Sequence, residues 1–185
     1  MRKVSGKENP QNVPGRRNVP GRDTGPAYSP ERRTWYGYGS LSREEKDGFG
    51  RFLHDATYIF GDISTMALPS FFYVMAADTA DSSAMTAGAL VAWMTMWVVG
   101  TTIRGGWIRP LATETLGWVS LRPSLLGLRL FAYNAVILVA AAGGVALAEV
   151  VPLAYVSLQF AFLVAFLFTL SFPSVAESLA RWLDS

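Results

Sequence analysis

The chain has 185 residues, of which 51% are hydrophobic, and its mean hydropathy is positive. Together with its long apolar runs, this composition argues against a soluble domain. The absence of cysteine excludes disulfides, iron–sulfur clusters, thiolate zinc sites and cysteine lipidation. The net charge of +2 is unevenly divided: residues 1–51 hold 11 Lys and Arg against 6 Asp and Glu, and residues 52–185 hold 5 against 8. Arginine predominates over lysine, which is typical of a GC-rich prokaryotic genome.

Residues 1–40 form a basic segment that is rich in proline and glycine and poor in aliphatic side chains. Such a segment cannot bury enough apolar surface to offset its ordering entropy, so we predict a disordered cytoplasmic tail. The motif Asn-Val-Pro-Gly-Arg occurs at 12–16 and again at 18–22, which favours two basic turns. The turns fit a solvated linker, and they also fit a contact with an acidic partner or with anionic lipid.

A short helix is predicted over residues 43–55, because a capping-box pattern begins at Ser42 and Phe49, Phe52 and Leu53 follow at helical spacing. We expect this helix to lie on the membrane surface. The preceding segment ERRTWYGYG mixes arginine with aromatic residues, which suits a headgroup interface. Similar residues also stack on single-stranded nucleic acid, but nucleic acid is not expected as a partner given the apolar runs that follow.

Four apolar segments come next, at residues 56–77, 84–103, 125–148 and 153–172. Each approaches the roughly 20 residues that a helix needs to cross a hydrocarbon core. They lack the two-residue alternation of barrel strands, and they therefore predict helices. The fold class expected for residues 41–185 is an all-α integral membrane domain with four transmembrane helices. A short amphipathic helix is expected after the last segment, over 174–182.

The loop over residues 104–124 holds most of the basic residues found beyond the first 51. If the tail is cytoplasmic, this loop and the C-terminus are cytoplasmic as well, and all basic residues fall on or near one side. We therefore predict a multi-pass protein of the plasma membrane with both termini cytoplasmic. The loop charges fit a role in fixing orientation alone, and they also fit contact with anionic headgroups or a cytoplasmic partner. The residues suited to that contact are Arg104, Arg109, Arg122, Trp107 and Trp118.

Polar residues inside the apolar segments form a second candidate site. An ionised carboxylate at Asp62 is costly within a bilayer unless it is paired. Arg129, near the start of the third segment, has a side chain long enough to reach the same depth, so we predict an Asp62–Arg129 ion pair. If the first segment begins just after Asp62, that carboxylate would instead be interfacial. Further polar groups within the segments are Tyr133, Asn134 and Gln159.

Small residues recur every four positions in the second and third segments, at Ala84, Gly88 and Ala92 and at Ala140, Gly144 and Ala148. This spacing lets membrane helices approach closely, although the abundance of alanine alone can produce it.

Catalytic constellations are missing from the sequence: there is one histidine, no serine–histidine arrangement and no phosphate-binding glycine loop. We therefore expect no enzymatic activity, no cofactor and no metal site. The first functional hypothesis is a structural or accessory membrane subunit whose tail and 104–124 loop contact anionic lipid or a partner. The second is an oligomeric transporter or channel for a small solute or ion that uses Asp62, Asn134 and Gln159. A homo-oligomer or a membrane-protein partner is compatible with either hypothesis.

Overall fold

The computed structural model describes residues 48–77, 81–113, 123–151, 153 and 155–183, and all regular structure within these residues is helical. The expectation of an all-helical domain is therefore confirmed. Three helices are long and apolar enough to cross a membrane: α5 (Ser82–Gly105), α6 (Pro123–Val150) and α7 (Val156–Leu183). A bent pair, α3 (Gly48–Met66) and α4 (Leu68–Ala76), would supply a fourth span if the two are counted together. These lengths and compositions indicate a membrane protein.

The α3–α4 pair departs from the sequence prediction in two ways. Residues 56–77 do not form one straight helix, because the chain bends by 54° between α3 and α4. Pro69 stands in the first turn of α4 and has no N–H to continue the ladder of the preceding helix, which explains the break. In addition, α3 begins at Gly48 and passes residue 55 without interruption, so no separate surface helix ends there. The predicted residues before Gly48 lie outside the described part of the chain.

Helix α7 extends further than the sequence predicted. Residues 174–182 are not a separate amphipathic helix but the continuation of α7, which contains Pro173. A proline inside a helix removes one backbone hydrogen bond, and membrane helices tolerate this loss where neighbouring groups compensate. Next to the proline, the Ser174 hydroxyl donates to the Ser171 carbonyl at 2.7 Å.

Helices α5, α6 and α7 pack closely through small side chains. A Cβ added at Gly144 would lie 2.8 Å from the carbonyl oxygen of Ser157, so α6 approaches α7 at backbone distance. A Cβ added at Gly88 would lie 3.3 Å from the Cα of Ala141, which marks a similar approach of α5 to α6. Fully buried alanines line the same contacts, namely Ala92, Ala140, Ala161 and Ala165. This packing is how helices associate where lipid removes the hydrophobic driving force.

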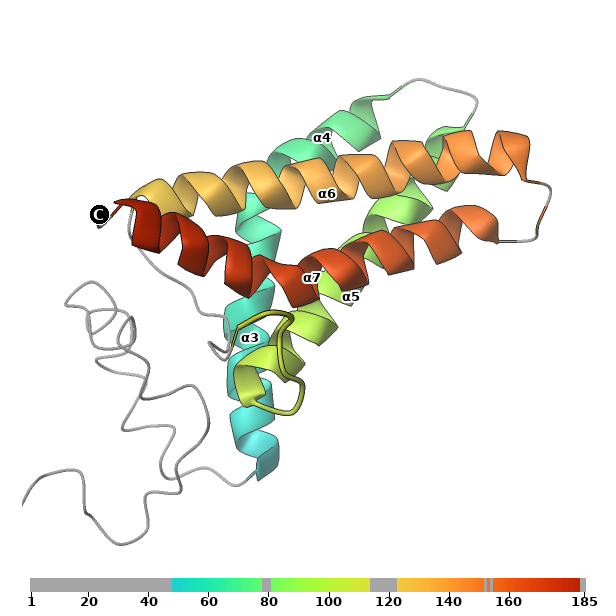
Figure 1. Cartoon of the computed structure of the whole chain (residues 1–185). Coiled ribbons are helices and arrows are strands. Elements are labelled where there is room, and N and C mark those ends of the chain that lie inside the picture. Colours follow the sequence, from blue (N-terminus) through green and yellow to red (C-terminus); the bar gives the residue numbers. More distant parts are fainter. Residues whose placement is uncertain (1–47, 78–80, 114–122, 152, 154, 184–185) are drawn as a thin grey trace, which may run out of the picture.

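Figure 1 shows α6 and α7 as long antiparallel neighbours, with α5 running obliquely beside them. Helix α3 lies crosswise to α6 and α7, and the chain then turns at Ala67 so that α4 follows the general direction of the bundle. Helix α5 ends at Gly105, and the next residue, Gly106, caps it with a left-handed backbone (φ 82°). The segment after it is joined to α7 by a hydrogen bond from the Leu111 N–H to the Leu170 carbonyl at 2.8 Å.

Candidate functional site

The candidate site lies where α3 crosses the bundle, and its basis is the placement of two carboxylates on one face of that helix. Asp55 and Asp62 are seven residues apart, which is about two helical turns, so their side chains point the same way. That face is turned toward the other helices. Each carboxylate forms an ion pair with an arginine of a different helix. One ion pair joins α3 to α5, and the other joins α3 to α6.

The first pair joins Asp62 to Arg129 of α6. The Arg129 Nη1 lies 2.5 Å from the Asp62 Oδ1, and the two side chains are 3% and 6% exposed. The Tyr133 hydroxyl donates a hydrogen bond to the second carboxylate oxygen at 3.3 Å. The structure therefore brings together three residues that the sequence had grouped. Because both charges are withdrawn from solvent, each depends on the other for its stability.

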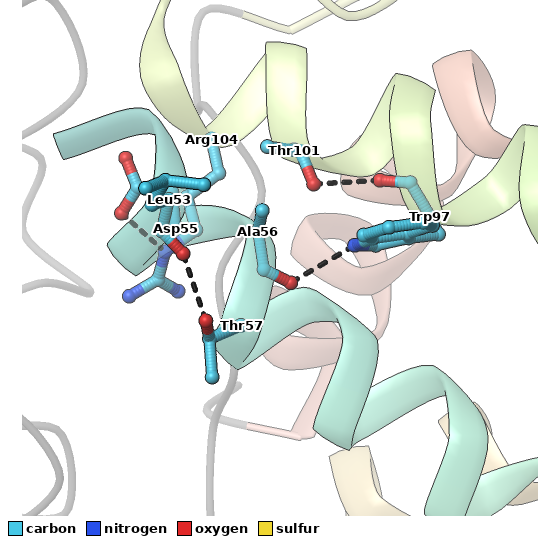
Figure 2. A network of polar contacts seen from close by, with 7 residues as sticks. All are labelled: Leu53, Asp55, Ala56, Thr57, Trp97, Thr101 and Arg104. Carbon is cyan, nitrogen blue, oxygen red and sulfur yellow. Dashed lines mark hydrogen bonds and ion pairs between the residues drawn. The ribbon is translucent and has the colours of Figure 1, made fainter. Parts of the chain in front are cut away.

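The second pair joins Asp55 to Arg104 of α5 (Figure 2). The Arg104 Nε donates to the Asp55 Oδ1 at 3.2 Å, and the two side chains are 4% and 1% exposed. The Arg104 guanidinium also lies 5.4 Å from the centroid of the Tyr58 ring, within the range of a cation–π contact. Sequence reasoning missed this pair. The signal that could have found it is the seven-residue spacing of the two aspartates, each of which needs a cation.

Neutral hydrogen bonds extend the contact between α3 and α5. The Trp97 indole N–H donates to the Ala56 carbonyl of α3 at 2.9 Å, while the Thr101 hydroxyl bonds within α5 to the Trp97 carbonyl at 2.7 Å (Figure 2). One turn before Trp97 in α5, the Trp93 indole donates to the Ser64 hydroxyl at 3.2 Å. The face of α3 that contacts α5 is therefore held by polar groups along much of its length.

Asn134 of α6 occupies the break between α3 and α4. Its side-chain N–H₂ donates to the Met66 carbonyl at 2.7 Å, and its oxygen accepts from the Ser70 N–H at 2.7 Å. In an unbroken helix these two backbone groups would bond to each other, since they are four residues apart. The Asn134 amide is thus inserted into the interrupted ladder and satisfies both groups. Its role in the structure is to stabilise the bend.

A small cavity lies beside the two ion pairs, with a volume of about 50 Å³. Its polar lining comes from Asp62, Arg104, Tyr133 and Thr169, and the rest is apolar. A space of this size can hold a few water molecules at most. In the described part of the chain, no three histidine, aspartate or glutamate side chains gather as metal ligands would.

The residues predicted to contact headgroups are placed differently from one another. Arg104 requires a correction: it is buried against Asp55 and does not present its charge to headgroups. Trp107 and Arg109 are exposed in the segment after α5, where the Trp107 ring also packs on Phe52 at a centroid distance of 5.4 Å. Two further predicted residues, Trp118 and Arg122, lie outside the described residues.

Gln159 does not join the other polar groups. It is exposed on α7 and stands nine residues before Phe168, or about 13 Å along the helix from the cavity lining. The three residues expected to line a transport path, Asp62, Asn134 and Gln159, therefore do not converge within one chain.

Residues 46–179 match the model of a family described as Domain of unknown function (DUF8215). A search of curated proteins and a search of solved structures found no match.

Proposed function

We propose that this chain, which belongs to the DUF8215 family, is a non-enzymatic structural or accessory subunit of a membrane. One observation carries the proposal: the polar side chains within the helices bind other parts of the same chain. Asp55, Asp62 and their arginines connect α3 to α5 and α6, and Asn134 satisfies the backbone at the bend. Side chains committed in this way stabilise one arrangement of helices, whereas a transport path needs polar groups that exchange partners with a solute.

The proposal includes an orientation in the plasma membrane with both termini cytoplasmic. It is supported by the charge distribution, because this orientation gathers the basic residues of the chain on or near one side. Since the chain has no cysteine, single cysteines at Asp81 and Thr115 can be labelled one at a time in intact cells. An impermeant reagent should label position 81 and spare position 115, and the reverse pattern would invert the orientation.

The tail and the 104–124 loop are the parts that we propose to contact anionic lipid or a cytoplasmic partner. In the described portion of that loop, Trp107 and Arg109 support this role because both are exposed next to the end of α5. An exposed arginine beside an interfacial tryptophan is suited to a phosphate headgroup.

The competing function is an oligomeric transporter or channel for a small solute or ion. The observation in its favour is the cavity of about 50 Å³ that Asp62 borders. An oligomer could add lining groups from neighbouring copies, including the exposed Gln159.

Ion flux separates the two functions. The full chain is reconstituted in liposomes, and fluxes of protons, sodium, potassium and chloride are compared with protein-free liposomes. We expect no flux above the control. A flux that is lost in Asp62→Asn, while the variant keeps its helical content, would establish the transporter and overturn the proposal.

Lipid retention tests the second part of the proposal. Native mass spectrometry of the purified chain should detect more phosphatidylglycerol than phosphatidylcholine bound from an equimolar mixture. Arg109→Gln should reduce this preference, whereas Arg181→Gln removes an exposed arginine from the last turn of α7 and should leave it unchanged. Equal effects of the two variants would show that net charge alone attracts the lipid.

A further inference from the structure

Helix α3 has a distribution of polarity opposite to that of a helix on the surface of a soluble protein. Its two aspartates face the other helices, while its exposed side chains, among those that the structure describes, carry no charge. The exposed side chains form a stripe at helical spacing, here named the outward stripe: Phe49, Leu53, Thr57 and Phe60. A helix that faces water shows its charged residues outward and buries its apolar face. The outward stripe is therefore suited to lipid.

The depth at which α3 lies follows from the lengths of uncharged sequence in the other helices. No charged residue occurs over 82–103 of α5, 130–148 of α6 or 156–176 of α7. At 1.5 Å per residue these stretches measure about 33, 28 and 31 Å, close to the roughly 30 Å of a hydrocarbon core. The charges next to these stretches are Arg104, Arg129 and Glu177. Both arginines form ion pairs with α3, and Glu177 accepts a hydrogen bond from Thr113 in the segment that follows α5. These three residues mark one edge of the hydrocarbon core.

Both aspartates of α3 pair with arginines that lie at this edge of the hydrocarbon core. Asp55 and Asp62 are about 10 Å apart along α3, yet their partners Arg104 and Arg129 both lie where the uncharged stretches end. A helix parallel to the bundle would carry its two aspartates to depths differing by about 10 Å. A helix along the edge carries both to the same depth, which agrees with the crosswise course of α3 in Figure 1.

We propose that α3 lies in the plane of the membrane at one interface, with its outward stripe bound to the glycerol and upper acyl region of that leaflet. The mixed composition of the stripe, with phenylalanine, leucine and threonine, suits a region that is partly apolar and partly hydrated. The crossing then begins only at the bend, with α4. Its nine residues span about 13 Å, less than half of the hydrocarbon core. This placement holds whether the chain is an accessory subunit or a transporter.

The test compares the depth of two positions on α3 with two on α6. Single cysteines at Leu53 and Phe60 are spin-labelled in the full chain in liposomes, and depth is measured from collision with oxygen and with a water-soluble nickel chelate. Phe131 and Val139 serve as the matched control, because both are exposed on α6 and are eight residues, or about 12 Å, apart along the helix. All four side chains are exposed, so the labels do not enter the core.

The expected result is a depth difference between positions 53 and 60 of less than half the difference between positions 131 and 139. A spanning α3 would instead separate its two labels by about 10 Å, nearly as much as the control pair. A difference of half the control value or more would overturn the in-plane placement. Because the measurement concerns depth alone, it is independent of the flux assay that tests the proposed function.

Discussion

The α6–α7 hairpin and the α3–α4 pair are held in the molecule by different kinds of interaction. Along the hairpin, glycine and alanine bring two long antiparallel helices to backbone distance. Helix α3 lies crosswise to α6 and contacts it only over a short stretch, and it is fixed by two buried ion pairs together with hydrogen bonds from two indoles of α5. Dispersion forces accumulate where two backbones run closely side by side, as in the hairpin, whereas charged and polar contacts hold α3.

The largest effect is expected from breaking an ion pair of α3. Asp62→Asn leaves the Arg129 charge buried without its counter-charge, and we expect a loss of about 3–5 kcal/mol in the free energy of unfolding. The measurement is an SDS titration in bicelles followed by far-UV circular dichroism. The control is Arg181→Gln, whose ion pair with Glu177 is long, at 3.9 Å, and largely exposed. We expect that control to cost less than about 0.5 kcal/mol.

The double variant Asp62→Asn/Arg129→Gln sharpens this result. If the two side chains interact as the structure indicates, the second substitution removes the unpaired charge and recovers part of the loss. Losses that simply add would mean that the pair does not contribute to holding α3.

The bend between α3 and α4 should give the next largest effect. Asn134→Leu keeps a similar volume but leaves the Met66 carbonyl and the Ser70 N–H without partners. At about 1–2 kcal/mol for each of the two groups, the lower part of the range for an unsatisfied buried group, we expect a loss of about 2–4 kcal/mol in the same titration. Gln159→Leu is the matched control, because it replaces an exposed amide on α7, and it should be nearly neutral. Equal losses in the two variants would show that Asn134 does not stabilise the bend.

The hairpin is tested by adding one methyl group. Gly144→Ala places a Cβ 2.8 Å from the Ser157 carbonyl oxygen, so the backbones must separate, and we expect a loss of about 1–3 kcal/mol. Gly127→Ala makes the same change on the same helix, at a position where nothing lies within 4 Å of the added Cβ. Higher helix propensity should then stabilise that variant by up to about 1 kcal/mol. If both variants gain stability, close approach of α6 and α7 is not essential.

The two regions also differ in how far the sequence predicts them. The helices α5, α6 and α7 follow from long apolar runs, because length and hydropathy are local properties. The sequence does not predict the bend at Ala67, although it contains Pro69 two residues later. A proline in this position is compatible with a kinked span as well as with a new helix, and the Asn134 side chain that stabilises the break comes from another part of the chain.

The candidate site shows the same division between local and distant information. Asp62 and Arg129 could be grouped from the sequence because their expected depths agree and each charge needs a partner. The position of Arg104 in a basic loop predicts a headgroup contact, and nothing in the sequence near Asp55 indicates that it is the partner of Arg104. The crosswise course of α3 brings them together, and this course is a property of tertiary packing that no local pattern in the sequence specifies.

The smallest effect is expected from the neutral contacts of α3. Trp97→Phe keeps an aromatic ring in place but removes the indole N–H that donates to the Ala56 carbonyl at 2.9 Å. Hydrogen bonds between membrane helices contribute about 0.6 kcal/mol on average, so we expect a loss of that order in the SDS titration. Trp93→Phe removes a longer bond, of 3.2 Å, to a Ser64 hydroxyl that can rotate toward another acceptor, and it should cost less.

This last pair of variants tests whether charge is what fixes α3. Both substitutions act on the same helix contact as the Asp55–Arg104 pair, but they leave every charge and its counter-charge in place. If α3 is held mainly by its ion pairs, the loss in the free energy of unfolding must be several-fold smaller in each tryptophan variant than in Asp62→Asn. Comparable losses would mean instead that α3 is held by the area of its contact with α5, and the distinction between the crossing helix and the hairpin would then disappear.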